Sequence, residues 1–185
     1  MSKITVLGAG MVGRAIARDL AASHSVRSVD RDPEALAPLS GAVATQQADL
    51  SDAAAVRTHI ADADLVVCAV PGFMGFRTMQ TLIDAGKKVV DISFMPEDVL
   101  TLDGLAKERG AIVVADMGVA PGMDNLILGH HDASMTVTRF ECLVGGLPKR
   151  RTYPFEYKAP FSPIDVIEEY TRPARYVRNG AEESG

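Results

Sequence analysis

A glycine-rich turn near the N-terminus constrains the fold of this chain more than any other feature. Gly8, Gly10 and Gly13 form the pattern G-x-G-x-x-G between a strand-like run, Lys3–Leu7, and a helical pattern, Met11–Ala22. In a β-α-β unit, such glycines allow the tight turn, the approach of a pyrophosphate to the backbone, and close packing of helix on strand. The context therefore predicts a dinucleotide-binding turn.

An acidic residue stands at the position that this interpretation requires. The second strand-like run, Ser25–Val29, leads to Asp30, which lies 20 residues after Gly10. At this spacing, dinucleotide-binding folds carry the carboxylate that accepts hydrogen bonds from the ribose hydroxyls. A carboxylate repels a 2′-phosphate, so Asp30 favours NAD over NADP. Arg31 beside it could pair with such a phosphate, which leaves NADP as the alternative.

Short apolar runs and helical patterns continue to alternate up to Gly118. The strands expected after Asp30 are Ala42–Gln47, Leu65–Val70, Lys88–Ile92 and Ala111–Ala115. The helices expected between them are Ser51–Ala61, with Ser51 as the cap, Phe76–Ala85, and Glu97–Arg109 with an interruption near Thr101–Gly104. This alternation predicts an α/β fold of the Rossmann type, with a doubly wound parallel sheet, in residues 1–118.

Composition excludes several classes of protein. The chain is 47% hydrophobic with a net charge of −5, which indicates a globular protein and gives no basic surface for nucleic acid. The longest apolar run, Leu65–Val70, is too short to span a membrane. Cys68 and Cys142 each lie in an apolar run, so we expect buried free thiols in a reducing, cytoplasmic setting. The histidines show no metal-ligand spacing, so we expect no metal site.

The pattern changes in residues 119–185. We expect helices over Pro121–Asp132 and Ser162–Tyr170, and strands over Val137–Val144, Phe155–Lys158 and Arg175–Arg178. Asn179-Gly180 is typical of a hairpin turn, yet we expect no returning strand in the few residues that follow. Too few elements remain to bury an apolar sheet face, so we predict a partial α+β substrate or dimerisation domain. It is incomplete, or another chain completes it.

Ligands of open α/β sheets bind at the carboxyl ends of the strands, so further cofactor contacts are expected there. Asp49 follows the third strand and could flank the adenine, and residues 69–71 follow the fourth, near the nicotinamide. Ordinary strand-terminating turns are the alternative for both. The candidate cofactor-binding residues are Gly8, Gly10, Met11, Val12, Gly13, Asp30, Arg31, Asp49, Ala69, Val70 and Pro71.

Several motifs together resemble one known family. They are Gly8–Gly13 with Asp30, Val89–Ser93, Asp116–Asn125, Val144–Pro148, Pro154, Tyr157-Lys158 and Phe161–Pro163. The sequence resembles the saccharopine dehydrogenase-like oxidoreductases from Lys3 to about Gly180, and is most similar to the lysine 6-dehydrogenase and saccharopine reductase branch. Asp116–Asn125 and the motifs after Val144 are more specific to that family than the glycine pattern.

The resemblance implies an NAD(P)-dependent amino acid dehydrogenase. Hydride would pass between nicotinamide and a carbon that bears nitrogen in a substrate such as lysine or saccharopine, and the resulting imine would hydrolyse to a semialdehyde. Members of the family usually continue beyond the point where this chain ends. The resemblance therefore also implies C-terminal truncation, and with it a homo-oligomer or a complementing chain.

Such a reaction needs a group that takes a proton from the amine and groups that hold the substrate carboxylate. Asp91 and Asp116 are the catalytic candidates on the amine side, because both end strands. Arg150 and Lys158, with Arg151, are the candidates on the carboxylate side, and a solvated basic loop is the alternative. Two other functions stay open: an NAD-binding protein that assembles with a partner and has no turnover of its own, and a nucleotide-sensing regulator.

Overall fold

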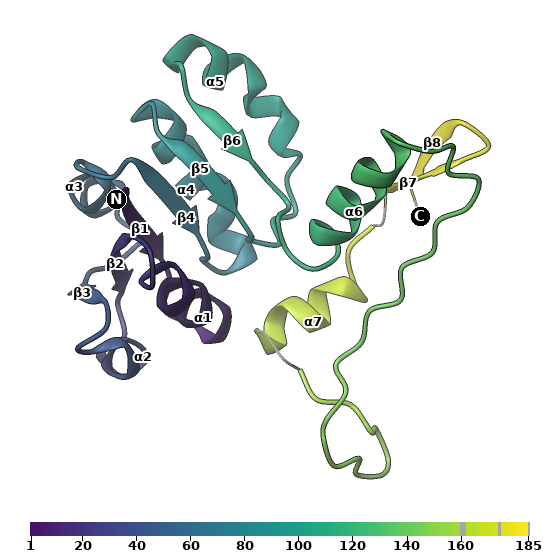
Figure 1. Cartoon of the computed structure of the whole chain (residues 1–185), viewed down its shortest axis with the longest axis horizontal. Coiled ribbons are helices and arrows are strands. Elements are labelled where there is room, and N and C mark those ends of the chain that lie inside the picture. Colours follow the sequence, from purple (N-terminus) through teal and green to yellow (C-terminus); the bar gives the residue numbers. More distant parts are fainter. Residues whose placement is uncertain (160–161, 174, 185) are drawn as a thin grey trace.

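The computed structural model describes residues 1–159, 162–173 and 175–184. Its N-terminal part is a six-stranded parallel sheet in the order β3-β2-β1-β4-β5-β6. The strands are β1 (Lys3–Leu7), β2 (Ser25–Asp30), β3 (Ala44–Gln47), β4 (Leu65–Cys68), β5 (Lys88–Asp91) and β6 (Ile112–Val114). The order reverses between β1 and β4, which is the doubly wound arrangement, so the predicted fold class is confirmed (Figure 1).

Helices cover both faces of the sheet because the central strands β1 and β4 are buried on both sides. They are α1 (Met11–Leu20), α2 (Pro33–Leu36), the 3₁₀ helix η1 (Ala37–Leu39), α3 (Ala53–Ile60), α4 (Gly72–Asp84), the 3₁₀ helix η2 (Val99–Leu102) and α5 (Asp103–Arg109). One core lies under α1 and α2 around Val6 and Leu39. The other lies under α3, α4 and α5 around Met79 and Leu82.

Three helix boundaries in this part bear on the predictions. The interruption expected near Thr101–Gly104 is confirmed, because η2 passes into α5 there. Ser51 is not the cap of α3. Asp52 takes that place and accepts a hydrogen bond from the amide of Ala54 at 2.9 Å. Helix α4 begins at Gly72, four residues before the predicted Phe76, so it starts shortly after the end of β4.

The second part holds α6 (Met123–Asp132), α7 (Pro163–Glu169) and a hairpin of β7 (Arg175–Arg178) and β8 (Ala181–Ser184). The predicted hairpin turn is confirmed, with positive φ at Asn179 (53°) and Gly180 (80°). The expectation of no returning strand was wrong, because β8 pairs with β7. Its residues, Ala-Glu-Glu-Ser, have low strand propensity, so the sequence gives no strand signal there. The turn and an ion pair between Arg178 and Glu183, at 3.6 Å, join β8 to β7.

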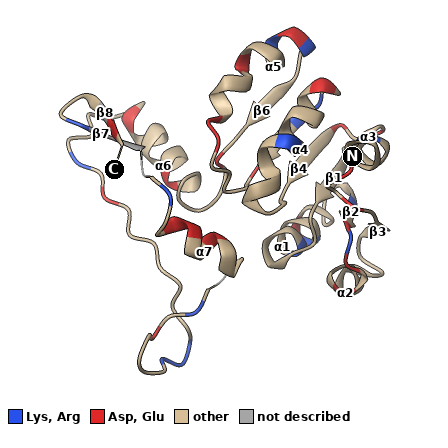
Figure 2. Ribbon diagram, turned by 180° about the vertical axis from the view of Figure 1, so that it is seen from behind, with Lys and Arg blue, Asp and Glu red and all other residues tan. Residues whose placement is uncertain are grey.

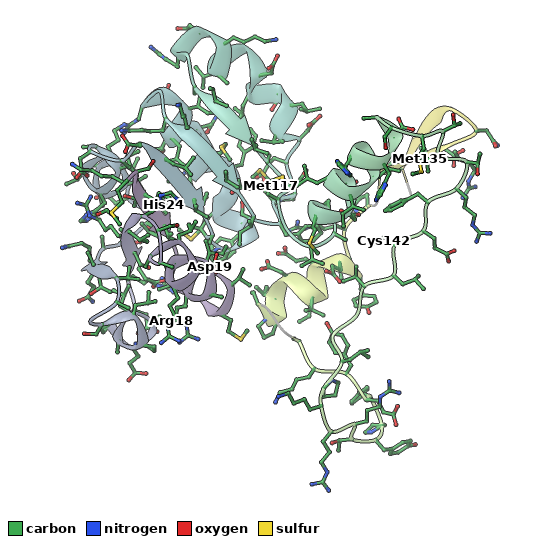
Figure 3. The ribbon with its side chains drawn as sticks, in the orientation of Figure 1. Arg18, Asp19, His24, Met117, Met135 and Cys142 are labelled. Carbon is green, nitrogen blue, oxygen red and sulfur yellow. The ribbon has the colours of Figure 1, made fainter. Side chains whose placement is uncertain are left out.

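Residues 133–159 form a long loop between α6 and α7 that runs away from the sheet (Figure 1). The strands predicted over Val137–Val144 and Phe155–Lys158 are therefore wrong. Their β-branched and aromatic residues favour extended backbone, but a strand needs a ladder of hydrogen bonds with a neighbour. The bond from the Lys158 amide to the Gly146 carbonyl oxygen, at 3.3 Å, does not extend into such a ladder in the described residues. Cys142 lies exposed on this loop, contrary to the expected burial (Figure 3), whereas Cys68 is buried as predicted.

No helix within the described ranges is both long enough and apolar enough to cross a membrane. The same residues contain no group of three His, Cys, Asp or Glu side chains placed to hold a metal ion. Phe161, which belongs to one of the family-like motifs, lies outside the described residues.

Candidate functional site

The glycine-rich turn joins β1 to α1 at the carboxyl edge of the sheet. Gly8 has a φ of 102°, and a Cβ there would lie 2.4 Å from the Ala69 carbonyl oxygen. A Cβ on Gly13 would lie 2.2 Å from the Gly8 carbonyl oxygen. Both positions therefore need glycine for the packing of the turn itself. A Cβ on Gly10, in contrast, would meet no atom within 4 Å, so the space above Gly10 is open.

The N-terminus of α1 opens into this space. Gly10 is its N-cap and supplies no side-chain hydrogen bond, and the first turn carries no acidic residue. The first amide groups of the helix thus keep their positive character, which suits an anion. Met11 and Val12 are 50% and 40% exposed beside it. The open space over Gly10 and the uncapped helix together fit the pyrophosphate of a dinucleotide.

Asp30, at the end of β2, is tied to the turn. Its carboxylate accepts hydrogen bonds from the amide of Ala9 at 2.6 Å and from the amide of Asp32 at 2.9 Å. The side chain is half-buried, and a carboxylate has lone pairs for more than two donors. Asp30 can therefore hold the turn and still accept from a ribose hydroxyl. Arg31, the next residue, is exposed.

Asp49 lies exposed after β3 and accepts hydrogen bonds from the amide and the hydroxyl of Ser51, at 2.9 and 2.8 Å. These bonds lower the pKa of its carboxyl, so it is ionised and engaged in its own turn. Ala69 shapes the wall of the glycine-rich turn, since it faces both Gly8 and Gly13. Val70 is buried in the core, so only its backbone can reach a ligand, and Pro71 is exposed as the N-cap of α4.

Asp91, at the end of β5, is fully buried. It accepts hydrogen bonds from the Ser93 hydroxyl at 2.8 and 3.0 Å and from the Ser93 amide at 3.2 Å, and it lies in register with Cys68 of β4. Burial raises the pKa of Asp91 to about 6, although the hydrogen bonds from Ser93 and Cys68 oppose the shift. This carboxyl holds the chain after β5 in place, and its burial argues against direct contact with a substrate.

Asp116 lies close to Asp91 but at the surface. The amide of Met117 donates to the Asp91 carbonyl oxygen at 2.9 Å, and the Asp116 charge contributes to the raised pKa of Asp91. Asp116 has a φ of 55° and is exposed where the chain leaves β6, next to Met117 (Figure 3). The two carboxyls predicted for the amine side thus come together, one buried and one accessible.

The predicted carboxylate-binding residues also come together, but elsewhere. Arg150 and Lys158 line one hollow of about 490 Å³ on the long loop, together with Lys149, Thr152 and Tyr157. Figure 2 shows the basic residues of this loop far from the sheet, and acidic residues along α7. The structure therefore does not bring Arg150 and Lys158 to Asp116.

Arg172, just after α7, is a cation of the second part that does reach the sheet edge, and the sequence did not indicate it. Its Nη1 donates to the Phe94 carbonyl oxygen at 2.8 Å, and its guanidinium carbon lies 4.6 Å from the centroid of the Phe94 ring. It also pairs with Glu168, one helical turn earlier. The only sequence signal that involves Arg172 is its spacing of four residues from Glu168. Such an i,i+4 pair does not by itself indicate a contact with a distant residue such as Phe94.

Comparison with known proteins identifies both parts of the chain. Residues 4–114 match the family described as saccharopine dehydrogenase NADP binding domain, and residues 118–184 match the saccharopine dehydrogenase C-terminal domain.

Among curated proteins, the NADP(+), L-glutamate-forming saccharopine dehydrogenase of Pyricularia oryzae is 29% identical over 139 residues, which cover 71% of this chain and 31% of that protein. The alpha-aminoadipic semialdehyde synthase of Arabidopsis thaliana is 27% identical over 139 residues, 71% of this chain and 13% of that protein. The chain thus spans less than a third of the length of these relatives.

Solved structures agree on the fold. The apo L-Glu-forming saccharopine dehydrogenase of Saccharomyces cerevisiae matches 100% of this chain and 44% of its own, with a TM-score of 0.69 at 21% identity. An imine reductase of Myxococcus stipitatus in complex with NAD+ matches 62% of this chain and 40% of its own, with a TM-score of 0.51 at 16% identity.

Proposed function

This chain belongs to the saccharopine dehydrogenase family, and on that premise we propose that it binds NAD and acts on a C–N bond of an amino acid such as lysine or saccharopine. The observation that carries the proposal is the pairing of an open glycine-rich turn with Asp30, described above. The Rossmann part, residues 1–118, would hold the dinucleotide. Residues 119–185 would contribute to the substrate side.

NAD is the proposed cofactor because Asp30 presents a carboxylate where a 2′-phosphate would lie. The family name and the relatives point instead to NADP, and Arg31 is the exposed cation that could hold its phosphate. The ratio of the affinities of this protein for NAD and NADP decides which of the two is its cofactor. We expect Arg31→Ala to leave NAD binding within about twofold, because an exposed charge contributes little to a neutral ribose. A large loss of NADP binding in that variant, with wild type preferring NADP, would reverse the assignment.

A bound nicotinamide supplies the acceptor or donor of hydride. The chain's own part is to hold the substrate and to move a proton, and Asp116 is the accessible carboxylate at the sheet edge for the amine. Asp91 beneath it would support the strand ends. Arg150 and Lys158 remain proposed partners of the substrate carboxylate. For that role, their loop must come to the sheet edge.

A second candidate function is supported by exposed apolar side chains in the second part. They are Met123, Leu126 and Ile127 on α6, Ile164 and Ile167 on α7, and Phe140, Leu143 and Val144 on the long loop, each at least 44% exposed. Exposed apolar side chains in such number are typical of a surface that another protein covers. The alternative is therefore an NAD-binding protein that assembles with a second copy or a complementing chain and has no turnover alone.

One pair of measurements separates these functions. NADH formation is followed after NAD and a panel of lysine-like amino acids are added, and light scattering gives the assembly state of the same sample. Turnover that falls strongly in Asp116→Asn, with NAD binding unchanged, supports the dehydrogenase function. General acid–base groups typically contribute about 10²–10⁴-fold to the rate. NAD binding and association without turnover support the alternative. Absence of dinucleotide binding contradicts both.

A further inference from the structure

The contact of Arg172 with Phe94 links the second part of the chain to the nucleotide-binding part. The two residues lie 78 positions apart, and the Arg172 side chain is only 17% exposed. The guanidinium is held in three ways: by the Phe94 carbonyl oxygen, by the Phe94 ring and by Glu168. A planar guanidinium that makes several contacts at once fixes the positions of Phe94 and Glu168 more firmly than the single ammonium group of a lysine would.

Phe94 belongs to residues 93–95, which press directly on the first turns of α4. A Cβ on Gly72 would lie 2.0 Å from the Phe94 carbonyl oxygen, and one on Gly75 would lie 2.4 Å from the Ser93 Oγ. The same Cβ on Gly72 would lie 3.4 Å from Nη2 of Arg172. The guanidinium, the Phe94 carbonyl and the start of α4 therefore meet at one point.

That point adjoins one half of the proposed dinucleotide site and not the other. Helix α4 starts directly after residues 69–71, which we assign to the nicotinamide half, whereas the adenosine half is assigned to Asp30 and the turn beside β2. The contact of Arg172, just after α7, with Phe94 places this end of the second part beside the chain that follows β5. A change at Arg172 would thus act on the nicotinamide half.

We propose that Arg172 is a positioning residue that holds residues 93–95 against the start of α4 and so shapes the nicotinamide half of the site. This inference rests on the proposed function, because it assumes that a dinucleotide binds. It assigns to the second part a role in cofactor binding through a single side chain. Arg172 itself need not touch the cofactor.

The test compares a whole dinucleotide with its adenosine half. NADH and ADP-ribose are titrated calorimetrically into the full chain, as wild type, Arg172→Ala and Arg172→Lys. We expect the affinity for ADP-ribose to agree within about twofold among the three proteins. We expect NADH to bind Arg172→Ala at least tenfold more weakly than wild type. The NADH affinity of Arg172→Lys should lie between those of wild type and Arg172→Ala, because lysine keeps the charge but loses the planar contact with Phe94.

Arg139→Ala is the matched control, since Arg139 is an 82% exposed arginine of the second part that pairs with Glu141. It should change neither affinity. Equal weakening of NADH and ADP-ribose in Arg172→Ala would show a general structural role and overturn the proposal, as would unchanged NADH affinity. If Arg172→Ala does not fold, Arg172→Lys carries the same comparison. Wild type that binds neither ligand would instead contradict the proposed function itself.

Discussion

The carboxylate of Asp30 accepts a hydrogen bond of 2.6 Å from the backbone amide of Ala9, between the first two glycines of the turn. This bond fastens the end of β2 to the turn that follows β1, so the ribose-binding and pyrophosphate-binding elements form one unit. A residue usually described as a ligand contact therefore also organises the turn. Changes at Asp30 should consequently affect binding through both roles.

We predict that Asp30→Ala weakens NADH binding by roughly ten- to a hundredfold, because hydrogen bonds to charged groups contribute about 1.5–3 kcal/mol. Asp30→Asn should weaken it less, since an amide oxygen can still accept from Ala9. Calorimetry with NADH measures both. Asp19→Asn, at an exposed carboxylate on α1 (Figure 3), is the control and should bind as wild type does. Equal affinity of Asp30→Ala and wild type would contradict the assignment.

Gly13 and Gly10 should respond differently to alanine. Gly13→Ala places a Cβ 2.2 Å from the Gly8 carbonyl oxygen, so we expect a large loss of stability, seen as a lower midpoint of denaturation. Gly10→Ala meets no atom, so the free energy of unfolding should hardly change. Its methyl group would instead occupy the space of the pyrophosphate and weaken NADH binding. A Gly10→Ala variant that binds NADH normally would show that the open space is not the ligand site.

The nucleotide-binding part could be predicted well because its signals are local. The turn glycines, the strand before them and Asp30 are all fixed by the short-range geometry of a β-α-β unit. The loop of residues 133–159 could not be predicted, since extended sequence becomes a strand only beside a partner. Arg172 was missed for a similar reason: its contact with Phe94 depends on how the two parts of the chain pack together.

The burial of Asp91 should appear in the pH dependence of stability. Its pKa is about 6 in the folded protein against an ordinary value of 3.8, so the folded state binds more protons between these values. The free energy of unfolding should therefore fall by about 3 kcal/mol as the pH rises through this window.

Urea denaturation at a series of pH values, for wild type and Asp91→Asn, measures this contribution. Asparagine keeps an acceptor for the Ser93 hydroxyl but cannot ionise. The difference between the two proteins should therefore grow from pH 4 to pH 6 in favour of the variant. Parallel profiles would mean that Asp91 does not titrate with a raised pKa.

The two thiols should differ in reactivity. Cys68 is buried and burial raises the pKa of its thiol, so it should react only on unfolding. Cys142 is exposed on the long loop and should react in the folded protein. Labelling with a disulfide reagent, before and after denaturation, gives the number of reactive thiols in the folded and in the unfolded protein. Protection of Cys142 in the native protein would indicate that this loop is covered in solution, as the assembling alternative requires.

Titration of the full chain with NADH, alongside Gly10→Ala and Asp19→Asn, tests the central claim most directly. The account predicts saturable binding to wild type and Asp19→Asn alike, and affinity at least tenfold weaker in Gly10→Ala, whose stability is unchanged. Absence of saturable binding of both NADH and NADPH to folded wild type would contradict it. So would equal affinity of Gly10→Ala and wild type, because the open turn would then not be where the dinucleotide binds.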